Sequence, residues 1–215
     1  MLHVNALTAF DGTPVTTWKN VVHGAPVLTA EGRAVPTELP WDASDPTPLV
    51  LLSFSTVPEQ RSPAMLQCAL DALGPLPVHV VATTGGIVDP KELTAPANAH
   101  LVPFADHELL MERASFVVGH GGHGTTMRAL RRGLPMVGIP AKGADQIPIT
   151  QLIDSWGAGR ALPGDASATQ IRAAAQELLS NPAFRSEACR RSLAFAGMDG
   201  AQLAASSVES VLRPS

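Results

Sequence analysis

From residue 49 to the end of the chain, short apolar runs alternate with segments of helical apolar spacing, and this alternation constrains the fold most strongly. The runs cover 49–54, 78–83, 99–104, 115–119 and 135–140, with a shorter one at 159–162. Such lengths suit strands that are buried on both faces of a parallel sheet. Helices are predicted near 62–73, 106–114, 125–132, 146–156, 167–180, 183–195 and 200–212. The pattern predicts an α/β fold, a doubly wound parallel sheet with helices on both faces.

Residues 1–48 have a different character from the rest of the chain. Proline, glycine and isolated polar residues interrupt this segment, and neither helical nor strand periodicity is sustained in it. We therefore expect a linker or arm over 1–48 and a single α/β domain over 49–215.

Charge and hydropathy argue against several classes of partner. Fifteen basic and nineteen acidic residues give a net charge of -4, without the basic patch that nucleic-acid binding usually needs. No run of 18 apolar residues occurs, and the first twenty residues lack the basic start and apolar core of a secretory signal. These features predict a cytoplasmic protein, and we expect neither nucleic acid nor membrane as a partner.

The stretch VVGHGGHGTT leads an apolar run through a glycine-rich turn into a predicted helix. In doubly wound sheets, ligands bind beyond the carboxyl ends of the strands, where a helix N-terminus presents N–H groups and the positive end of its dipole. The glycines remove Cβ atoms that would keep a phosphate away from those N–H groups. His120 at the strand exit and Thr125 in the first helical turn can donate hydrogen bonds to phosphate oxygens. The turn is therefore predicted to bind an anion.

A dinucleotide site is one alternative interpretation of the same turn. Gly119, Gly121 and Gly124 satisfy G-x-G-x-x-G, and Asp145 follows about twenty residues later. That fingerprint belongs after the first strand of its sheet, whereas this turn follows roughly the fourth. The position of the turn therefore argues against an NAD-binding Rossmann domain, which stays open as an alternative.

A metal site is a second alternative. His120 and His123 are three residues apart, and His107 could be a distant third ligand. The sequence contains neither H-E-x-x-H nor a D-x-D pair that would hold a cation on a diphosphate. We therefore expect no metal.

The stretch FVVGHGGHGTTMRALRRGLPMVGIPAKGADQ resembles the nucleotide-sugar-binding half of the two-domain inverting glycosyltransferases. It carries the family's strand, His-Gly-Gly turn, Thr helix start, Gly-x-Pro strand entry and Asp-Gln pair in order and spacing. The similarity begins at LVLLSFST and is closest to bacterial natural-product (antibiotic) members. It implies a Rossmann-like sheet that is one half of a GT-B fold. It also implies that 49–215 is the donor-binding domain and that 1–48 is an interdomain linker with a remnant of an N-terminal acceptor domain.

The resemblance also assigns a donor site by position. Asp145 and Gln146 would hold hydroxyl groups of the donor sugar, since a carboxylate accepts hydrogen bonds and an amide both donates and accepts. Phe104 would neighbour the nucleobase, although a phenylalanine there could equally belong to the core. The residues implied to bind the donor diphosphate are His120, Gly121, Gly122, Gly124 and Thr125, with Ser55 and Thr56 after the first predicted strand.

The reaction implied by the resemblance is displacement at the anomeric carbon with inversion. A general base deprotonates an acceptor hydroxyl while the nucleoside diphosphate leaves, and neither a metal nor another cofactor is needed. The family's base is a histidine near the start of the acceptor domain, which 1–48 is too short to form; His3 and His23 match a different part of the family. We expect no catalytic residue in this chain.

The chain is therefore expected to bind a UDP or dTDP sugar without turning it over. The small-molecule acceptor would bind to an N-terminal domain, so that the chain is a fragment of a longer enzyme. A donor-binding subunit that works with a separate acceptor subunit is the alternative, and a non-catalytic nucleotide-sugar-binding module stays open. An exposed apolar side could also drive self-association.

Overall fold

The computed structural model describes residues 2–4, 21–23, 25–28, 38–60, 62–141 and 146–212. Its centre is a six-stranded, all-parallel sheet in the order β5-β4-β3-β6-β7-β8. The first strand of the sheet, β3, is central, and the chain moves outward on one side through β4 and β5 before it crosses to β6. The strands are β3 (Leu49–Ser53), β4 (His79–Thr83), β5 (Ala99–Val102), β6 (Ala114–Gly119), β7 (Met136–Gly138) and β8 (Gly159–Ala161).

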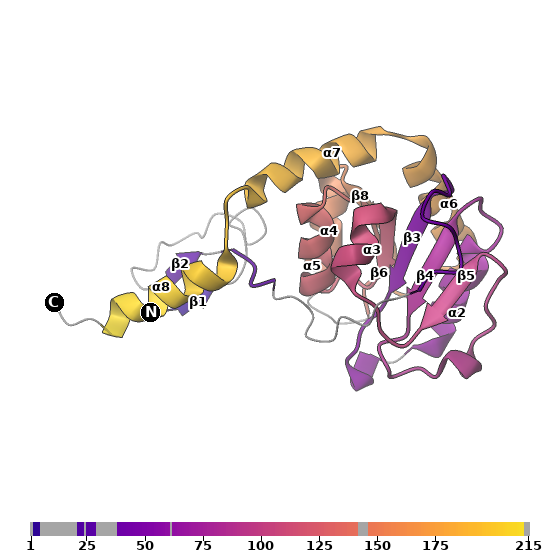
Figure 1. Ribbon diagram of the computed structural model, residues 1–215, viewed down its shortest axis with the longest axis horizontal. Helices are drawn as coiled ribbons and strands as arrows, with labels where there is room; N and C mark the ends of the chain where they lie inside the picture. The colour runs from indigo at the N-terminus through magenta and orange to yellow at the C-terminus, as the bar shows by residue number, and fades with distance from the viewer. Residues whose placement is uncertain are drawn as a thin grey trace.

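Side chains that alternate along the strands form a core on each face of the sheet. Val50 and Leu52 pack with α2 (Pro63–Leu73) and α6 (Ala168–Ser180). Leu49 and Leu51 pack on the other face. The helices of that second face are α3 (His107–Arg113), α4 (His123–Arg131), α5 (Gln146–Ser155) and α7 (Ala183–Ser192). The predicted doubly wound α/β sheet is confirmed, and Figure 1 shows α3, α4 and α5 together beside the sheet.

The helix that follows the glycine turn begins earlier than its sequence predicts. We expected a start near Thr125, but α4 begins at His123, and Gly122 is its N-cap. Gly124 and Thr125 therefore lie within the first turn. By contrast, Asp106 caps α3 by accepting hydrogen bonds from two backbone N–H groups. Gly122 has no side chain with which to do this.

The described part of the N-terminal segment contains regular structure that was not predicted. β1 (Leu2–Val4) and β2 (Val21–His23) pair in parallel. Strands of three residues are too short to produce a visible period, which explains why periodicity did not reveal them. At the other end of the chain, the start of α8 (Gly200–Leu212) lies against the backbone of Ala25 and Pro26. Figure 1 shows α8 with β1 and β2, beyond the end of α7. No helix in the described ranges is both long and apolar enough to span a membrane.

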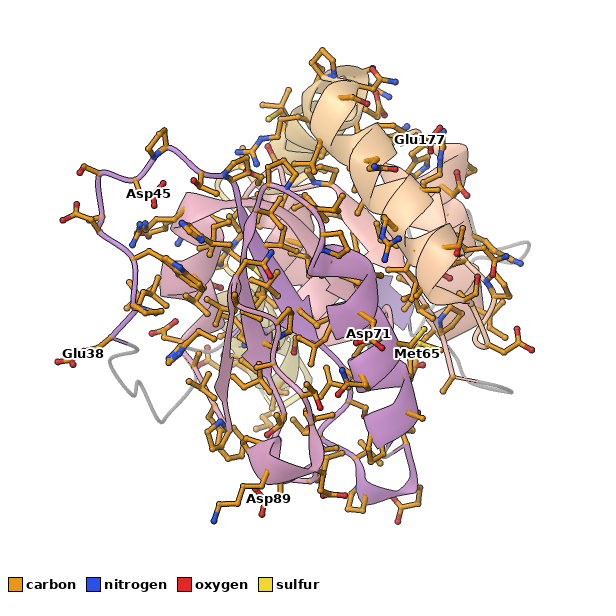
Figure 2. The ribbon with its side chains drawn as sticks, turned by 90° about the vertical axis from the view of Figure 1, so that its right-hand side faces the viewer. Glu38, Asp45, Met65, Asp71, Asp89 and Glu177 are labelled. Atoms are coloured by element: carbon orange, nitrogen blue, oxygen red, sulfur yellow. The ribbon has the colours of Figure 1, made fainter. Side chains whose placement is uncertain are left out.

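The segment that leads into β3 is fixed to the sheet by an aromatic stack and a hydrogen bond to a histidine. The Trp41 and His79 rings stack with centroids 4.1 Å apart and planes 18° apart. His79 Nε2 lies 2.8 Å from Asp45 Oδ2, and the Thr47 N–H donates to Asp45 Oδ1. Figure 2 shows Asp45 on this loop, at the opposite side of the view from Glu177. These contacts order the entry to the central strand.

Asp45 is expected to make stability depend on acid pH. The hydrogen bond with His79 and the hydrogen bonds from Thr47 together lower the pKa of Asp45 from 3.8 to about 2. A depressed folded-state pKa means that the contribution is present above about pH 4 and is lost as pH falls toward 2. Asp45→Asn should therefore flatten the fall in the urea-derived free energy of unfolding across this window. Parallel curves for the two proteins would contradict this role.

Candidate functional site

The glycine turn lies where the direction of chain winding reverses. In the sheet, Ser53 at the end of β3 is in register with Gly119 of β6 and with Thr83 of β4. α2, after β3, covers one face of the sheet, and α4, after β6, covers the other. The loops after β3 and β6 therefore diverge at a topological switch point, where open α/β sheets bind ligands.

Two glycines allow close packing around this turn. A Cβ on Gly119 would collide with the carbonyl oxygen of Ser53, so this glycine brings β6 close to β3. Gly121 has a φ of +78°, in the left-handed region, and a Cβ there would collide with Thr150 Cγ2 of α5. Gly121 therefore makes the turn, and α5 presses against it from outside.

The His120 ring lies across the start of α4. A Cβ on Gly122 would collide with His120 Nε2 and lie 2.9 Å from Cε1, so Gly122 leaves room for this ring. His120, Gly122, Gly124 and Thr125 are all partly exposed. A partly exposed imidazole thus lies beside the backbone N–H groups of a helix N-terminus. This arrangement can bind an anion by hydrogen bonds and by the helix dipole.

The loop after β3 contributes one buried and one exposed hydroxyl. Ser55 is buried, and its Oγ accepts a hydrogen bond from the Val57 N–H at 3.0 Å. Thr56 is exposed and packs against Gly85, where a Cβ would lie 2.9 Å from Thr56 Cγ2. Only Thr56 presents its side chain at the surface. A ligand role for both residues stays a prediction.

Of the two residues predicted to hold the sugar, the structure describes only Gln146. Asp145 lies outside the described residues. Gln146 is 5% exposed at the start of α5. Its Oε1 accepts from the Ala141 N–H at 3.2 Å, and its Nε2 donates to Gln60 Oε1 at 3.2 Å. The Gln146 amide thus links the loops after β7 and β3, and any sugar contact would be made from this fixed position.

Phe104 is not part of the core. Its side chain is 45% exposed, and its ring edge lies against Gly86, where a Cβ would lie 2.8 Å from Cζ. The nearby His107 ring contacts the sheet, since Thr83 Oγ1 lies 3.3 Å from His107 Nε2 and donates to Ser53 Oγ. An exposed ring at the carboxyl edge is available for stacking, and the role of Phe104 as a nucleobase neighbour stays a prediction.

The described residues contain no cluster of three His, Cys, Asp or Glu side chains that could hold a metal ion. His107 instead takes part in the contact with Thr83. The metal hypothesis therefore lacks a ligand set in this part of the chain.

Sequence analysis did not single out Gln60 and Arg128. Gln60 is 86 positions from Gln146, and no local pattern connects them. Arg128 follows Gly124 by four residues on the same helix, and a Cβ on Gly124 would lie 3.2 Å from Arg128 Nη1. The i to i+4 spacing could have indicated this contact, because such side chains lie on one helix face.

One sequence relative and two solved structures of the same fold place this architecture among known proteins. A PGL/p-HBAD biosynthesis glycosyltransferase of Mycobacterium tuberculosis is 34% identical over 171 residues, which cover 79% of this chain and 38% of that protein. The calicheamicin glycosyltransferase CalG4 has a TM-score of 0.79 at 24% identity, over 98% of this chain and 51% of that one. The glycosyltransferase VinC, solved in complex with dTDP, has a TM-score of 0.66 at 21% identity, over 88% and 51%. This chain thus spans about half or less of their lengths.

The family model covers most of the sheet and part of the candidate site. The model for the C-terminal domain of erythromycin biosynthesis protein CIII-like proteins matches residues 67–196. This range is more than half of the chain and contains the glycine turn, α4 and Gln146. With the parallel sheet and its GT-B neighbours, the match leads to one conclusion: the chain belongs to the erythromycin biosynthesis protein CIII-like, C-terminal domain family.

Proposed function

We propose that this chain is the donor-binding half of an inverting glycosyltransferase, and that it binds a nucleoside-diphosphate sugar with UDP or dTDP as the nucleotide. Residues 49–215 form the donor-binding domain in this proposal, and 1–48 are the linker and the remnant of an acceptor domain. Family membership and relatives named as glycosyltransferases support it. The dTDP in the VinC structure supports a nucleoside diphosphate as the ligand class.

The observation that carries the proposal is the start of α4. His120 lies across Gly122, and the left-handed Gly121 turns the chain so that the first helical N–H groups face the carboxyl edge. Hydrogen-bond donors and a dipole fixed at this place stabilise the negative charge that grows on a departing diphosphate. The proposal requires no metal, since the positive potential comes from the backbone and His120.

The proposed reaction needs groups that the donor half does not supply. An acceptor hydroxyl attacks the anomeric carbon, its proton passes to a base on the acceptor side, and the nucleoside diphosphate leaves. Thr125, Ser55 and Thr56 add hydroxyl groups to the diphosphate site in this proposal. Asp145 and Gln146 orient the sugar, and Phe104 neighbours the base. The acceptor and its base belong to an N-terminal domain or to a separate subunit.

The 215-residue chain should bind donors without processing them. We expect saturation-transfer NMR on a mixture of UDP-glucose and dTDP-glucose to show nucleotide signals from at least one of them. In the same samples, chromatography should find no more than one equivalent of nucleoside diphosphate released per chain, with or without simple alcohol acceptors. If the chain binds nucleotide and also completes multiple turnovers, the expectation that it lacks a catalytic base is wrong. The absence of saturation-transfer signals from both donors would contradict the proposed donor site.

A dinucleotide is the less favoured ligand, for a structural reason. The G-x-G-x-x-G turn follows β6, the fourth strand of the sheet, rather than β3. Its first glycine, Gly119, serves the packing of β6 against Ser53. In a dinucleotide fingerprint, the first glycine makes the tight turn after the first strand.

A further inference from the structure

A guanidinium group lies over the first turn of α4, at the proposed diphosphate site. Arg128 is one helical turn after Gly124, and helical side chains point back toward the N-terminus. A Cβ on Gly124 would lie 3.2 Å from Arg128 Nη1, so the guanidinium takes the space above that glycine. The Arg128 side chain is only 12% exposed. It is thus a largely buried cation beside the anion-binding N–H groups.

Glu108 of α3 lies beside this guanidinium and accepts hydrogen bonds from Arg131 and Arg132. Its Oε1 lies 3.5 Å from Arg128 Nε and 2.8 Å from Arg131 Nη2, and its Oε2 lies 3.2 Å from Arg132 Nη2. The carboxylate therefore approaches Arg128 at Nε, while Nη1 lies over Gly124. Arg131 and Arg132 are 40% and 35% exposed and lie further along α4. Of the three arginines, Arg128 is nearest to the N-terminal turn.

We propose that Arg128 binds the donor diphosphate directly, as a cation whose Nη1 lies over Gly124 beside the Glu108 carboxylate. This inference rests on the proposed function and adds a residue to its site. A guanidinium fork matches phosphate oxygens with two parallel hydrogen bonds, which a single ammonium does not do. Together with His120 and the helix dipole, it supplies the positive charge that the leaving group requires without a metal.

The chain offers a matched control for this role, because Arg131 contacts the same carboxylate from the same helix. Calorimetric titrations should use the 215-residue wild type, Arg128→Gln, Arg128→Lys and Arg131→Gln. The ligands are UDP, dTDP, uridine and thymidine. We expect Arg128→Gln to weaken diphosphate binding about tenfold or more, the usual effect of losing a charge-assisted hydrogen bond. Arg128→Lys should lose less, and Arg131→Gln should stay within about twofold of the wild type. Nucleoside affinity should change little in any variant.

The outcomes separate this inference from the proposed function. If the wild type binds UDP or dTDP and the Arg128 and Arg131 variants weaken it equally, Arg128 only joins α3 to α4 and the inference is overturned. Equal losses for nucleoside and diphosphate with Arg128→Gln would also overturn it. A wild type that binds neither diphosphate would overturn both the inference and the proposed function. Thermal unfolding of each variant shows whether it is folded. If Arg128→Gln does not fold, the comparison of Arg128→Lys with Arg131→Gln still tests the inference.

Discussion

His120→Ala should weaken the binding of UDP or dTDP by about 1 to 3 kcal/mol, the range for losing a hydrogen bond to a charged group. The ring lies against Gly122 at the start of α4, where a diphosphate would meet the first helical N–H groups. Because about 1.4 kcal/mol is a tenfold change in affinity, the loss is well within the range of isothermal calorimetry. The effect should be absent for uridine and thymidine, which have no phosphate.

His100→Ala is a suitable control for this variant. His100 is a partly buried histidine on the edge strand β5, where its ring makes an edge contact with Trp41. It should leave diphosphate affinity unchanged within about twofold. Unchanged affinity in His120→Ala, with the protein folded, would remove His120 from the site.

Gly121→Ala should be among the most destabilising single changes in the chain. A left-handed φ of +78° costs an L-residue about 1 to 2 kcal/mol, and a methyl group forced into a packed neighbour costs about 1 to 3 kcal/mol more. The neighbour is Thr150 Cγ2 of α5, which is buried against this turn. We therefore expect urea denaturation to show a loss of about 2 to 5 kcal/mol.

Thr150→Ser separates the two costs of Gly121→Ala. Serine lacks the methyl group but keeps the hydroxyl that donates to the Ile147 carbonyl oxygen at 2.9 Å. Gly121→Ala with Thr150→Ser should therefore be less destabilised than the sum of the single changes, and the strain of the left-handed backbone should remain. A double-mutant cycle measures this coupling. Additive losses would show that α5 does not press on the turn as described.

The sheet could be predicted because its signal is local. The run 49–52 is uniformly apolar, and in the structure it is buried together with Ser53, the last residue of that strand. The start of α4 was placed two residues too late because His123 and Gly124 are weak helix formers, and tertiary position decides the boundary there. β1 and β2 were missed because three residues cannot establish a period.

The site could be predicted only in part, for the same physical reason. The glycine turn, the strand exit and the helix start are contiguous in sequence, so their proximity to one another follows from the motif. The contact of Gln146 with Gln60 joins positions 86 apart and depends on how α5 packs against the loop after β3. Gly122 was expected to let a phosphate approach, whereas the structure shows that it also accommodates the His120 ring. Such pairings depend on the folded backbone.

The most direct test of the donor-binding assignment is a calorimetric titration of the purified chain with UDP, dTDP and NAD, each with and without a chelator. The account predicts saturable binding of UDP or dTDP that a chelator does not weaken, with no heat from NAD. Binding of NAD alone would mean that the G-x-G-x-x-G turn holds a dinucleotide and would contradict the account.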